Sequence, residues 1–268
     1  NNTTISLSKT EIRENPIAIS KVIEDGSKKI GYLMYNQFAS SYDQQLNAAF
    51  NTFSAAAVDD LIIDLRYNGG GSTNTAGFLG SMITGQFPGQ VYSKEVWNRK
   101  VTNAFSPEDF INNFPTRIIK TDGNNEVVID EAINSLKLER VYFIVTGSSA
   151  SASELVMNSL NAHIEVNVIG SKTVGKQVGS ITLYDSDNLQ RTGENLNTNH
   201  TYAMQPLVLE IKNKDDINFP NGIIPGTNFT GIEWSEDIGD LGTLGERSDP
   251  LLEKTLNFIA TGEKTFSR

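Results

Sequence analysis

The stretch that decides the fold is DLIIDLRYNGGGS, residues 60–72, in which a short apolar run leads into a glycine loop. The run predicts a buried strand, and residues 28–38 (KKIGYLMYNQF) predict another strand before it. Between the two, four apolar residues repeat with the spacing of an amphipathic helix, namely Leu46, Ala49, Phe50 and Phe53. A further helix is predicted from about Asn74. This order of elements is typical of an α/β fold with stacked βαβ units and a mostly parallel sheet.

Bulk composition excludes several classes of protein. The chain has 268 residues and a formal net charge of −10, which disfavours nucleic acid or an anionic membrane as the main partner. It contains no cysteine, so disulfides, thiolate nucleophiles and cysteine-ligated zinc are excluded, while the redox compartment stays open. No apolar run approaches the ~18 residues of a membrane-spanning helix, and the start of the chain has no signal-peptide pattern.

The second half of the chain continues the alternation of strands and helices. Residues 140–147 (RVYFIVTG) predict a buried strand, residues 151–162 a helix, and residues 165–170 (EVNVIG) the next strand.

Three further segments carry structural expectations. The chain is expected to close with a helix that has Ser248 as its N-cap and ends at Gly262. Residues 127–137 (VVIDEAINSLK) are interpreted as a helix, and residues 99–115 as a lid or an insertion.

A cluster of serines lies in residues 146–160 (TGSSASASELVMNSL), where a predicted strand passes into a predicted helix. Ser151 and Glu154 fit a capping box, in which the serine does no more than start the helix. Hydrolases also place a nucleophile at such a turn, because the free N–H groups and the positive end of the helix dipole can stabilise an oxyanion. The residues of this segment alone leave both interpretations open.

Neither histidine is well placed as the base that a serine nucleophile needs. His163 follows Ser151 by twelve residues, near the far end of the same predicted helix. His200 lies in a polar loop.

A lysine is the other candidate base, provided that burial lowers its pKa from about 10.4 toward neutrality. Lys172 and Lys176 lie in VIGSKTVGKQVG, after the strand at residues 165–170. The glycine before Lys176 lets the backbone turn sharply there. A single lysine is ordinarily a solvated surface charge, so the case for Lys176 rests on its combination with the serine cluster.

That combination, SSASASELVMNSL followed by VIGSKTVGKQ, resembles the carboxyl-terminal processing (tail-specific) serine peptidases. Their pattern is a Ser-Ala-Ser-Ala-Ser-Glu run, a helix, a strand that ends in glycine, and then Gly-Lys. The resemblance covers about residues 30–259 and implies a ClpP/crotonase-like α/β core that needs no metal or cofactor. It implies that Ser151 is the nucleophile and that Lys176, 25 residues later, is the base.

The segment LIIDLRYNGGGS resembles a second motif of that family, Asp-Leu-Arg-x-Asn-Pro-Gly-Gly. By position, the resemblance implies an oxyanion hole made by the N–H groups of Gly70 and Ala152. Taken without the family, the three glycines also fit a simple tight turn between a strand and a helix. A phosphate-binding loop is disfavoured, because neither G-x-G-x-x-G nor G-x-x-x-x-G-K-[ST] is present.

The chain departs from the family pattern at several points. Gly69 replaces the proline of the glycine loop, and Ser180 replaces a glutamine that orients the lysine in some relatives. Glu154 is therefore a candidate orienting residue, and Ser180 a weaker one. Residues 1–29 are interpreted as an N-terminal segment or linker and residues 30–268 as the catalytic domain, which leaves no room for the PDZ domain that relatives carry.

The sequence thus predicts a serine endopeptidase with a Ser151/Lys176 dyad that cleaves protein or peptide substrates near their C-terminus. The resemblance also implies a location outside the cytoplasm, as in the periplasm. One alternative is a non-catalytic ligand- or peptide-binding domain on the same fold, with the serine motif kept for capping. A second is an esterase or amidase acting on small substrates.

Overall fold

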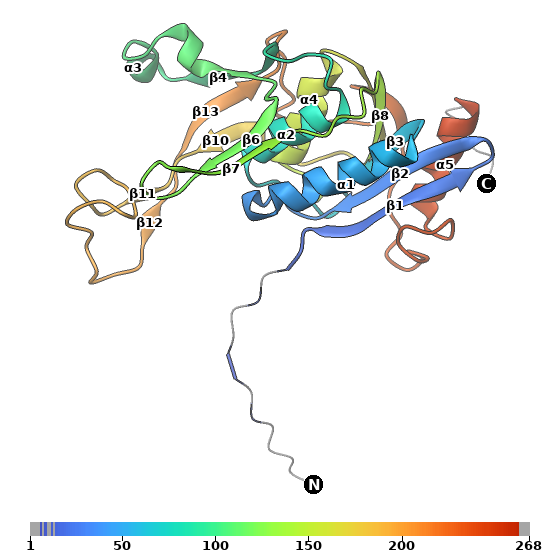
Figure 1. The fold of residues 1–268 in the computed structure, drawn as a ribbon, viewed down its shortest axis with the longest axis horizontal. Helices are drawn as coiled ribbons and strands as arrows, with labels where there is room; N and C mark the ends of the chain where they lie inside the picture. The colour runs from blue at the N-terminus through green and yellow to red at the C-terminus, as the bar shows by residue number, and fades with distance from the viewer. Residues whose placement is uncertain (1–5, 7, 10–11, 13, 263–268) are drawn as a thin grey trace.

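The computed structural model describes residues 6, 8–9, 12 and 14–262, and a six-stranded sheet forms its centre (Figure 1). In spatial order the strands are β1 (Ile17–Asp25), β2 (Lys28–Tyr35), β3 (Asp60–Asp64), β8 (Arg140–Val145), β9 (Glu165–Gly170) and β14 (Thr230–Glu233). β1 pairs with β2 in antiparallel fashion, and every other pair in this sheet is parallel. The predicted α/β fold with a mostly parallel sheet is confirmed.

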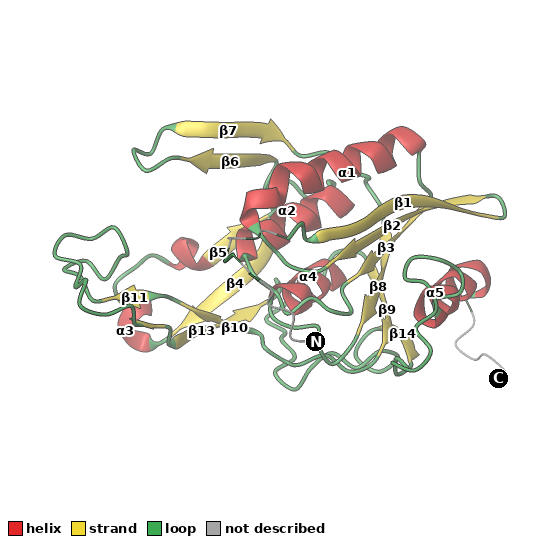
Figure 2. Ribbon diagram, turned by 90° about the horizontal axis from the view of Figure 1, so that it is seen from below, coloured by secondary structure: helices red, strands yellow, loops and turns green. Residues whose placement is uncertain are grey.

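Helices cover both faces of the central sheet, as Figure 2 shows. On one face lie α1 (Asp43–Ala56), α2 (Thr73–Ile83) and α4 (Ala152–Asn161), and on the other lies α5 (Pro250–Thr261). β3 serves both cores by alternation, because Leu61 and Ile63 join the cluster under the first three helices while Ile62 joins the cluster under α5. This double burial explains why the strand reads as a continuous apolar run.

A second, four-stranded antiparallel sheet lies beside α4. In spatial order its strands are β10 (Val178–Ser180), β13 (Leu207–Lys212), β4 (Val91–Trp97) and β5 (Ile111–Asn113). Two hairpins extend from the body, β6 (Arg117–Thr121) with β7 (Val127–Ala132), and β11 (Leu183–Tyr184) with β12 (Ala203–Met204) (Figure 2). The short helices are η1 (Ser40–Tyr42), α3 (Arg99–Thr102) and η2 (Pro107–Phe110).

The structure differs from the sequence-based expectation at residues 127–137, which do not form a helix. Val127–Ala132 is the strand β7, paired with β6 from Arg117↔Ala132 to Thr121↔Val127. The β-branched residues at the start of this segment favour a strand once a partner strand is present, and that partner lies outside the sequence window.

The closing helix starts one residue later than expected. Its N-cap is Asp249, whose Oδ1 accepts from Leu251 N–H at 3.1 Å, and not Ser248, whose hydroxyl accepts from Thr243 N–H at 3.1 Å. Asp249 also pairs with Arg66, so a tertiary contact selects the cap. The helix ends as predicted, with Gly262 in the left-handed conformation at φ 68°.

Residues 17–25, expected in an N-terminal segment or linker, form β1 and pair along their length with β2. The described sheet therefore begins at Ile17. The assignment of residues 1–29 and 30–268 to separate units stays a prediction. Among the described helices, none has the length and apolar character needed to cross a membrane.

Candidate active site

Three loops meet at the carboxyl edge of the central sheet. The glycine loop, residues 69–71, follows β3; the serine turn, residues 148–151, follows β8; and the lysine loop, residues 171–177, follows β9. These strands are parallel neighbours, so their carboxyl ends lie side by side. The packing is close, because a Cβ added at Gly70 would lie 2.7 Å from the Cβ of Ser151.

Ser151 adopts a strained conformation between β8 and α4. Its φ of 57° and ψ of −114° lie outside the regions that an L-residue ordinarily occupies. Such a conformation costs about 1–3 kcal/mol and persists only where the surrounding structure enforces it. Nucleophilic serines of α/β-hydrolases occupy sharp strand-to-helix turns of this kind. Ser151 and Glu154 also form the predicted capping box. The same turn therefore both starts the helix and holds Ser151 in its strained conformation.

Ser151 differs from its neighbours in the serine cluster. The hydroxyl of Ser149 donates to Leu65 O at 2.8 Å, and the hydroxyl of Ser153 donates to Asn68 O at 2.9 Å. Both residues are fully buried, whereas Ser151 is half-buried. Ser149 and Ser153 therefore hold the turn against the loop that follows β3, and Ser151 between them is accessible to a substrate.

Glu154 is the centre of the site's hydrogen-bond network. Its carboxylate is fully buried and accepts four hydrogen bonds, two at each oxygen. The donors are Ser151 N–H (2.9 Å), Thr173 Oγ1 (2.5 Å), Gly175 N–H (2.6 Å) and Lys176 N–H (2.8 Å). A buried carboxylate is costly unless such bonds compensate for its lost hydration. One side chain thus joins the backbone of the serine turn to that of the lysine loop.

The lysine loop is held on its other side by residues 219–223. Thr173 Oγ1, while donating to Glu154, accepts from Ile223 N–H at 2.8 Å, and Thr173 N–H donates to Ile223 O at 3.0 Å. Gly175 has φ +90°, and a Cβ there would lie 2.5 Å from the nitrogen of Gly222. Only glycine fits this approach of two backbones. The backbone before Lys176 is therefore fixed from two directions.

The structure places Lys176 differently from the expectation of a buried amine. The residue is exposed, and its amine makes no hydrogen bond or ion pair with any residue that the structure describes. Ser180 pairs with Leu207 in the second sheet, and no hydrogen bond joins it to Lys176 in the described ranges. Glu154, the other orienting candidate, binds the backbone N–H of Lys176 and not its amine.

The two predicted oxyanion donors lie next to Ser151 but differ in whether their N–H groups already donate a hydrogen bond. Ala152 is the first residue of α4, so its N–H has no partner within the helix. The N–H of Gly70 donates to Asn68 Oδ1 at 2.8 Å, within a turn in which Gly70 has φ +104°. An oxyanion is a stronger acceptor than an amide oxygen and would compete with Asn68 for this donor.

Asn68 is a site residue that the sequence analysis did not single out. It is fully buried, and its backbone carbonyl accepts two hydrogen bonds, from Ala150 N–H at 3.1 Å and from the Ser153 hydroxyl. These two donors flank Ser151 in the sequence. Its amide donates to Tyr35 O at 2.8 Å. The only sequence signal was its place in the Asp-Leu-Arg-x-Asn motif.

Arg66 anchors the start of the loop that carries Asn68 and the glycines. The side chain is 1% exposed and binds Asp64 Oδ2 at 2.7 Å and Asp249 Oδ2 at 2.6 Å. Burial raises the pKa of the Asp64 carboxyl, and the Arg66 guanidinium opposes that rise. Glu236 is a third partner, at 3.0 Å from the guanidinium. The network ties the end of β3 to the beginning of α5.

Both histidines lie away from the three loops. His163 Nε2 donates to Val91 O at 2.9 Å, its ring is tilted against Phe87 and edge-on to Phe114, and burial lowers its pKa. His200 Nε2 lies 3.2 Å from Asp185 Oδ2, in the arm that carries β11 and β12. Among the described residues, no group of three or more His, Asp or Glu side chains is arranged to hold a metal ion.

Comparison with protein families identifies the chain. The family described as Peptidase family S41 matches residues 29–207, a span that includes all three loops and both motifs. The chain belongs to peptidase family S41. Family S41 consists of serine-type peptidases, and its match covers more than half of this sequence.

Two curated relatives are similar to this S41 chain. A protein named "Probable CtpA-like serine protease" from Staphylococcus epidermidis is 25% identical over 178 residues, covering 66% of this chain and 31% of the relative. One of the same name from Staphylococcus haemolyticus is 25% identical over 173 residues, covering 64% and 30%. The chain thus spans less than a third of the length of these relatives.

Solved structures agree with the fold of the S41 chain. A putative S41 protease from Bacteroides fragilis superposes with a TM-score of 0.73 at 23% identity, covering 95% of this chain and 60% of the other. The photosystem II D1 C-terminal processing protease superposes with a TM-score of 0.56 at 16% identity, covering 94% and 54%. The expected ClpP/crotonase-like architecture is confirmed by these similarities.

The contact between Gly70 and Ser151 predicts an asymmetry within the glycine loop. Gly70→Ala places a methyl group 2.7 Å from Ser151 Cβ at φ +104°, whereas Gly69→Ala meets no heavy atom within 4 Å. We expect Gly70→Ala to slow any reaction of Ser151 with a fluorophosphonate by about 100-fold or more, because the added methyl group displaces the Gly70 N–H, and losing an oxyanion donor has an effect of that size. Gly69→Ala is the matched control and should label like wild type. Equal labelling of the two variants would contradict the packing described here.

The four hydrogen bonds of Glu154 predict a local loosening in Glu154→Gln. The amide keeps one acceptor oxygen, but its NH₂ group then faces N–H donors, at a cost of about 1–3 kcal/mol for groups left unsatisfied. Amide hydrogen exchange should accelerate at Gly175 and Lys176 before it does so in the central sheet. Glu24→Gln, on an exposed position of β1, serves as control. Unchanged protection of the lysine loop would show that the carboxylate does not hold it.

Proposed function

We propose that this chain is the catalytic core of a serine endopeptidase with a Ser151/Lys176 dyad. The observation that carries the proposal is the strained conformation of Ser151 at a strand-to-helix turn, tied through Glu154 to the backbone of Lys176. Strain of this kind is concentrated at functional sites. Membership of family S41 supports the same reaction class.

In the proposed reaction, neutral Lys176 takes the proton of the Ser151 hydroxyl as Oγ bonds to the scissile carbonyl carbon. The N–H of Ala152, with that of Gly70, binds the oxyanion. The carbon–nitrogen bond then breaks, and the ammonium of Lys176 gives its proton to the leaving amine. Water attacks the acyl group while Lys176 takes a proton from it, and collapse of the second intermediate returns the proton to Ser151.

The exposed amine of Lys176 gives the substrate a part in assembling the dyad. The backbone of the residue is fixed by Glu154, whereas its side chain is free to turn. A polypeptide lying across the three loops would exclude water from the amine and favour its neutral form, the form that acts as a base. Substrate binding would therefore complete an arrangement in which the backbone is already in place.

We further propose that the substrates are polypeptides cleaved near their C-terminus. The support is family membership and similarity to proteins named CtpA-like serine protease and D1 C-terminal processing protease. We also propose a location outside the cytoplasm, which rests only on the family resemblance of the sequence. We also propose residues 30–268 as the catalytic unit, together with the paired strand β1.

The test is labelling with a serine-directed fluorophosphonate and hydrolysis of unfolded casein. Ser151→Ala and Lys176→Ala should each lose at least about 10³-fold in rate, because nucleophile and base act as a unit. The matched controls are Ser148→Ala, an exposed serine of the same turn, and Lys172→Ala, an exposed lysine of the same loop.

Each outcome of this test discriminates between functions. Full casein hydrolysis by Ser151→Ala would overturn the assignment of the nucleophile. Hydrolysis of small esters without cleavage of casein would favour an esterase, and the absence of any Ser151-dependent reaction would favour a binding domain on the same fold.

A further inference from the structure

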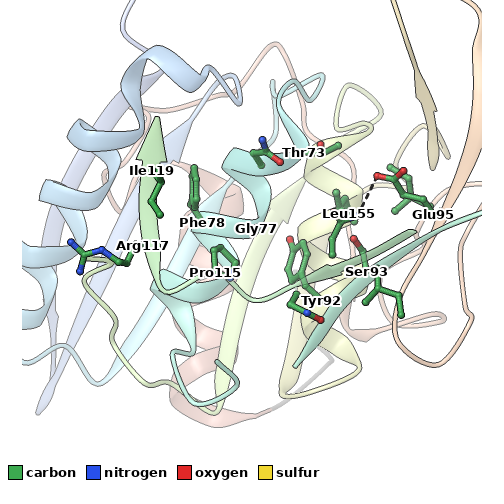
Figure 3. A pocket seen from close by; sticks show the side chains of 15 residues that line it. Thr73, Gly77, Phe78, Tyr92, Ser93, Glu95, Pro115, Arg117, Ile119 and Leu155 are labelled. Atoms are coloured by element: carbon green, nitrogen blue, oxygen red, sulfur yellow. Dashed lines mark hydrogen bonds between the residues drawn. The ribbon is translucent and has the colours of Figure 1, made fainter. Parts of the chain in front are cut away.

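A groove of about 350 Å³ opens between α2 and the four-stranded sheet (Figure 3). Thr73, Gly77 and Phe78 of α2 form one wall, and β4, β5 and β13 form the floor. Leu155 of α4 closes the groove toward the serine turn.

This groove begins next to the proposed nucleophile. Leu155 follows Ser151 by four residues, so it lies on the same face of α4 about one turn, or ~5.4 Å, along the axis. Thr73 is the first residue of α2, directly after the glycine loop that packs on Ser151. The first turns of both helices at the site thus line the groove, and a side chain of a bound polypeptide can reach it.

The groove's lining is about equally polar and apolar, with charges at its ends. Its apolar lining includes Ile211, and Figure 3 shows Phe78, Pro115, Tyr92 and Leu155 in its middle. Figure 3 shows Glu95 and Arg117 on opposite sides of this apolar region. The two charges differ in their partners. The guanidinium of Arg117 pairs with Asp130.

Glu95 has no counter-ion among the residues that the structure describes. Its Oε2 accepts from Trp97 Nε1 at 2.9 Å, and its Oε1 accepts from Asn112 Nδ2 at 3.3 Å. Both donors are neutral, and no Lys, Arg or His in the described ranges forms an ion pair with it. The adjacent Lys94 is paired with Asp216. The two neutral donors hold a half-buried, uncompensated carboxylate at the groove.

The sheet also fixes how far Glu95 lies from the lysine loop. Glu95 of β4 pairs with Ile211 of β13, and Ile211 N–H donates to Gln177 O at 3.0 Å. Gln177 is the residue after Lys176. Two strand spacings separate Glu95 from Gln177, about 10 Å. That distance is about the length of three extended residues, so a polypeptide bound at the lysine loop is long enough to reach Glu95.

We propose that this groove binds a basic side chain, lysine or arginine, of the polypeptide substrate, with its charged group on Glu95. The inference rests on the proposed function and adds a substrate preference to it. The apolar middle of the groove suits the methylene stem of a lysine or arginine, which packs on apolar surface while its head group reaches a partner. The head group supplies the positive charge that Glu95 lacks.

The binding experiment uses the full chain carrying Ser151→Ala, so that it does not depend on hydrolysis. A random heptapeptide pool is passed over the immobilised protein, and the retained peptides are sequenced by mass spectrometry. A retained peptide is then resynthesised with norleucine in place of its lysine. We expect the lysine form to bind about tenfold more tightly, as for a partly buried ion pair.

Variants of Glu95 separate a role in recognition from a structural one. Added to the same background, Glu95→Gln keeps a hydrogen-bond acceptor and should remove the tenfold ratio, and Glu95→Lys should shift retention toward acidic peptides. Glu210→Gln changes an exposed carboxylate on the adjacent β13 position and should keep the preference. A merely structural Glu95 would not invert the charge preference.

Two results would overturn the inference. One is retention with no preference for lysine or arginine over norleucine, and the other is a preference that survives Glu95→Gln. Failure of the proposed function is a separate result, because it is read from the Ser151-intact chain as an absence of casein hydrolysis. Peptide selection by the Ser151→Ala chain would still be measurable in that case.

Discussion

The structure of the site depends on one buried carboxylate, that of Glu154. It accepts hydrogen bonds from the backbone of Ser151, Gly175 and Lys176 and from the hydroxyl of Thr173. Removing any of these donors leaves part of a buried charge uncompensated, which is far more costly than losing a surface contact. The two loops are therefore coupled through the backbone. Glu154 holds the main chain of Lys176, whereas the lysine amine has no hydrogen-bond partner among the residues that the structure describes.

The fold supplies the rigidity that this arrangement requires. β3, β8 and β9 bring the three loops to one edge, and the buried Arg66 network fixes the end of β3 against α5. The backbone carbonyl of Asn68 holds the serine turn through two hydrogen bonds. These contacts help the surrounding structure to enforce the strained conformation of Ser151. The groove beside the site is held by the same elements, because residues in the first turns of α2 and α4 line it.

Much of the fold could be predicted from local patterns. Apolar periodicity identified the main strands and helices, and the family resemblance, with its 25-residue spacing, implied Ser151 and Lys176 as a candidate pair. What could not be predicted is non-local. The segment at residues 127–137 is a strand because β6 pairs with it, and α5 is capped by Asp249 because Arg66 binds that residue. The capping-box pattern predicted that Glu154 contacts Ser151, but not that Glu154 also accepts from the backbone N–H groups of Gly175 and Lys176.

The measurement that tests the central claim most directly is a crystal structure of the full chain reacted with a peptidyl phosphonate. We predict a covalent bond from Ser151 Oγ to phosphorus and a phosphoryl oxygen within hydrogen-bond distance of Ala152 N–H. The amine of Lys176 should turn to within about 3.2 Å of Ser151 Oγ, with the bonds from Glu154 unchanged. Reaction at another serine, or an adduct in which the lysine amine still points to solvent, would contradict the account.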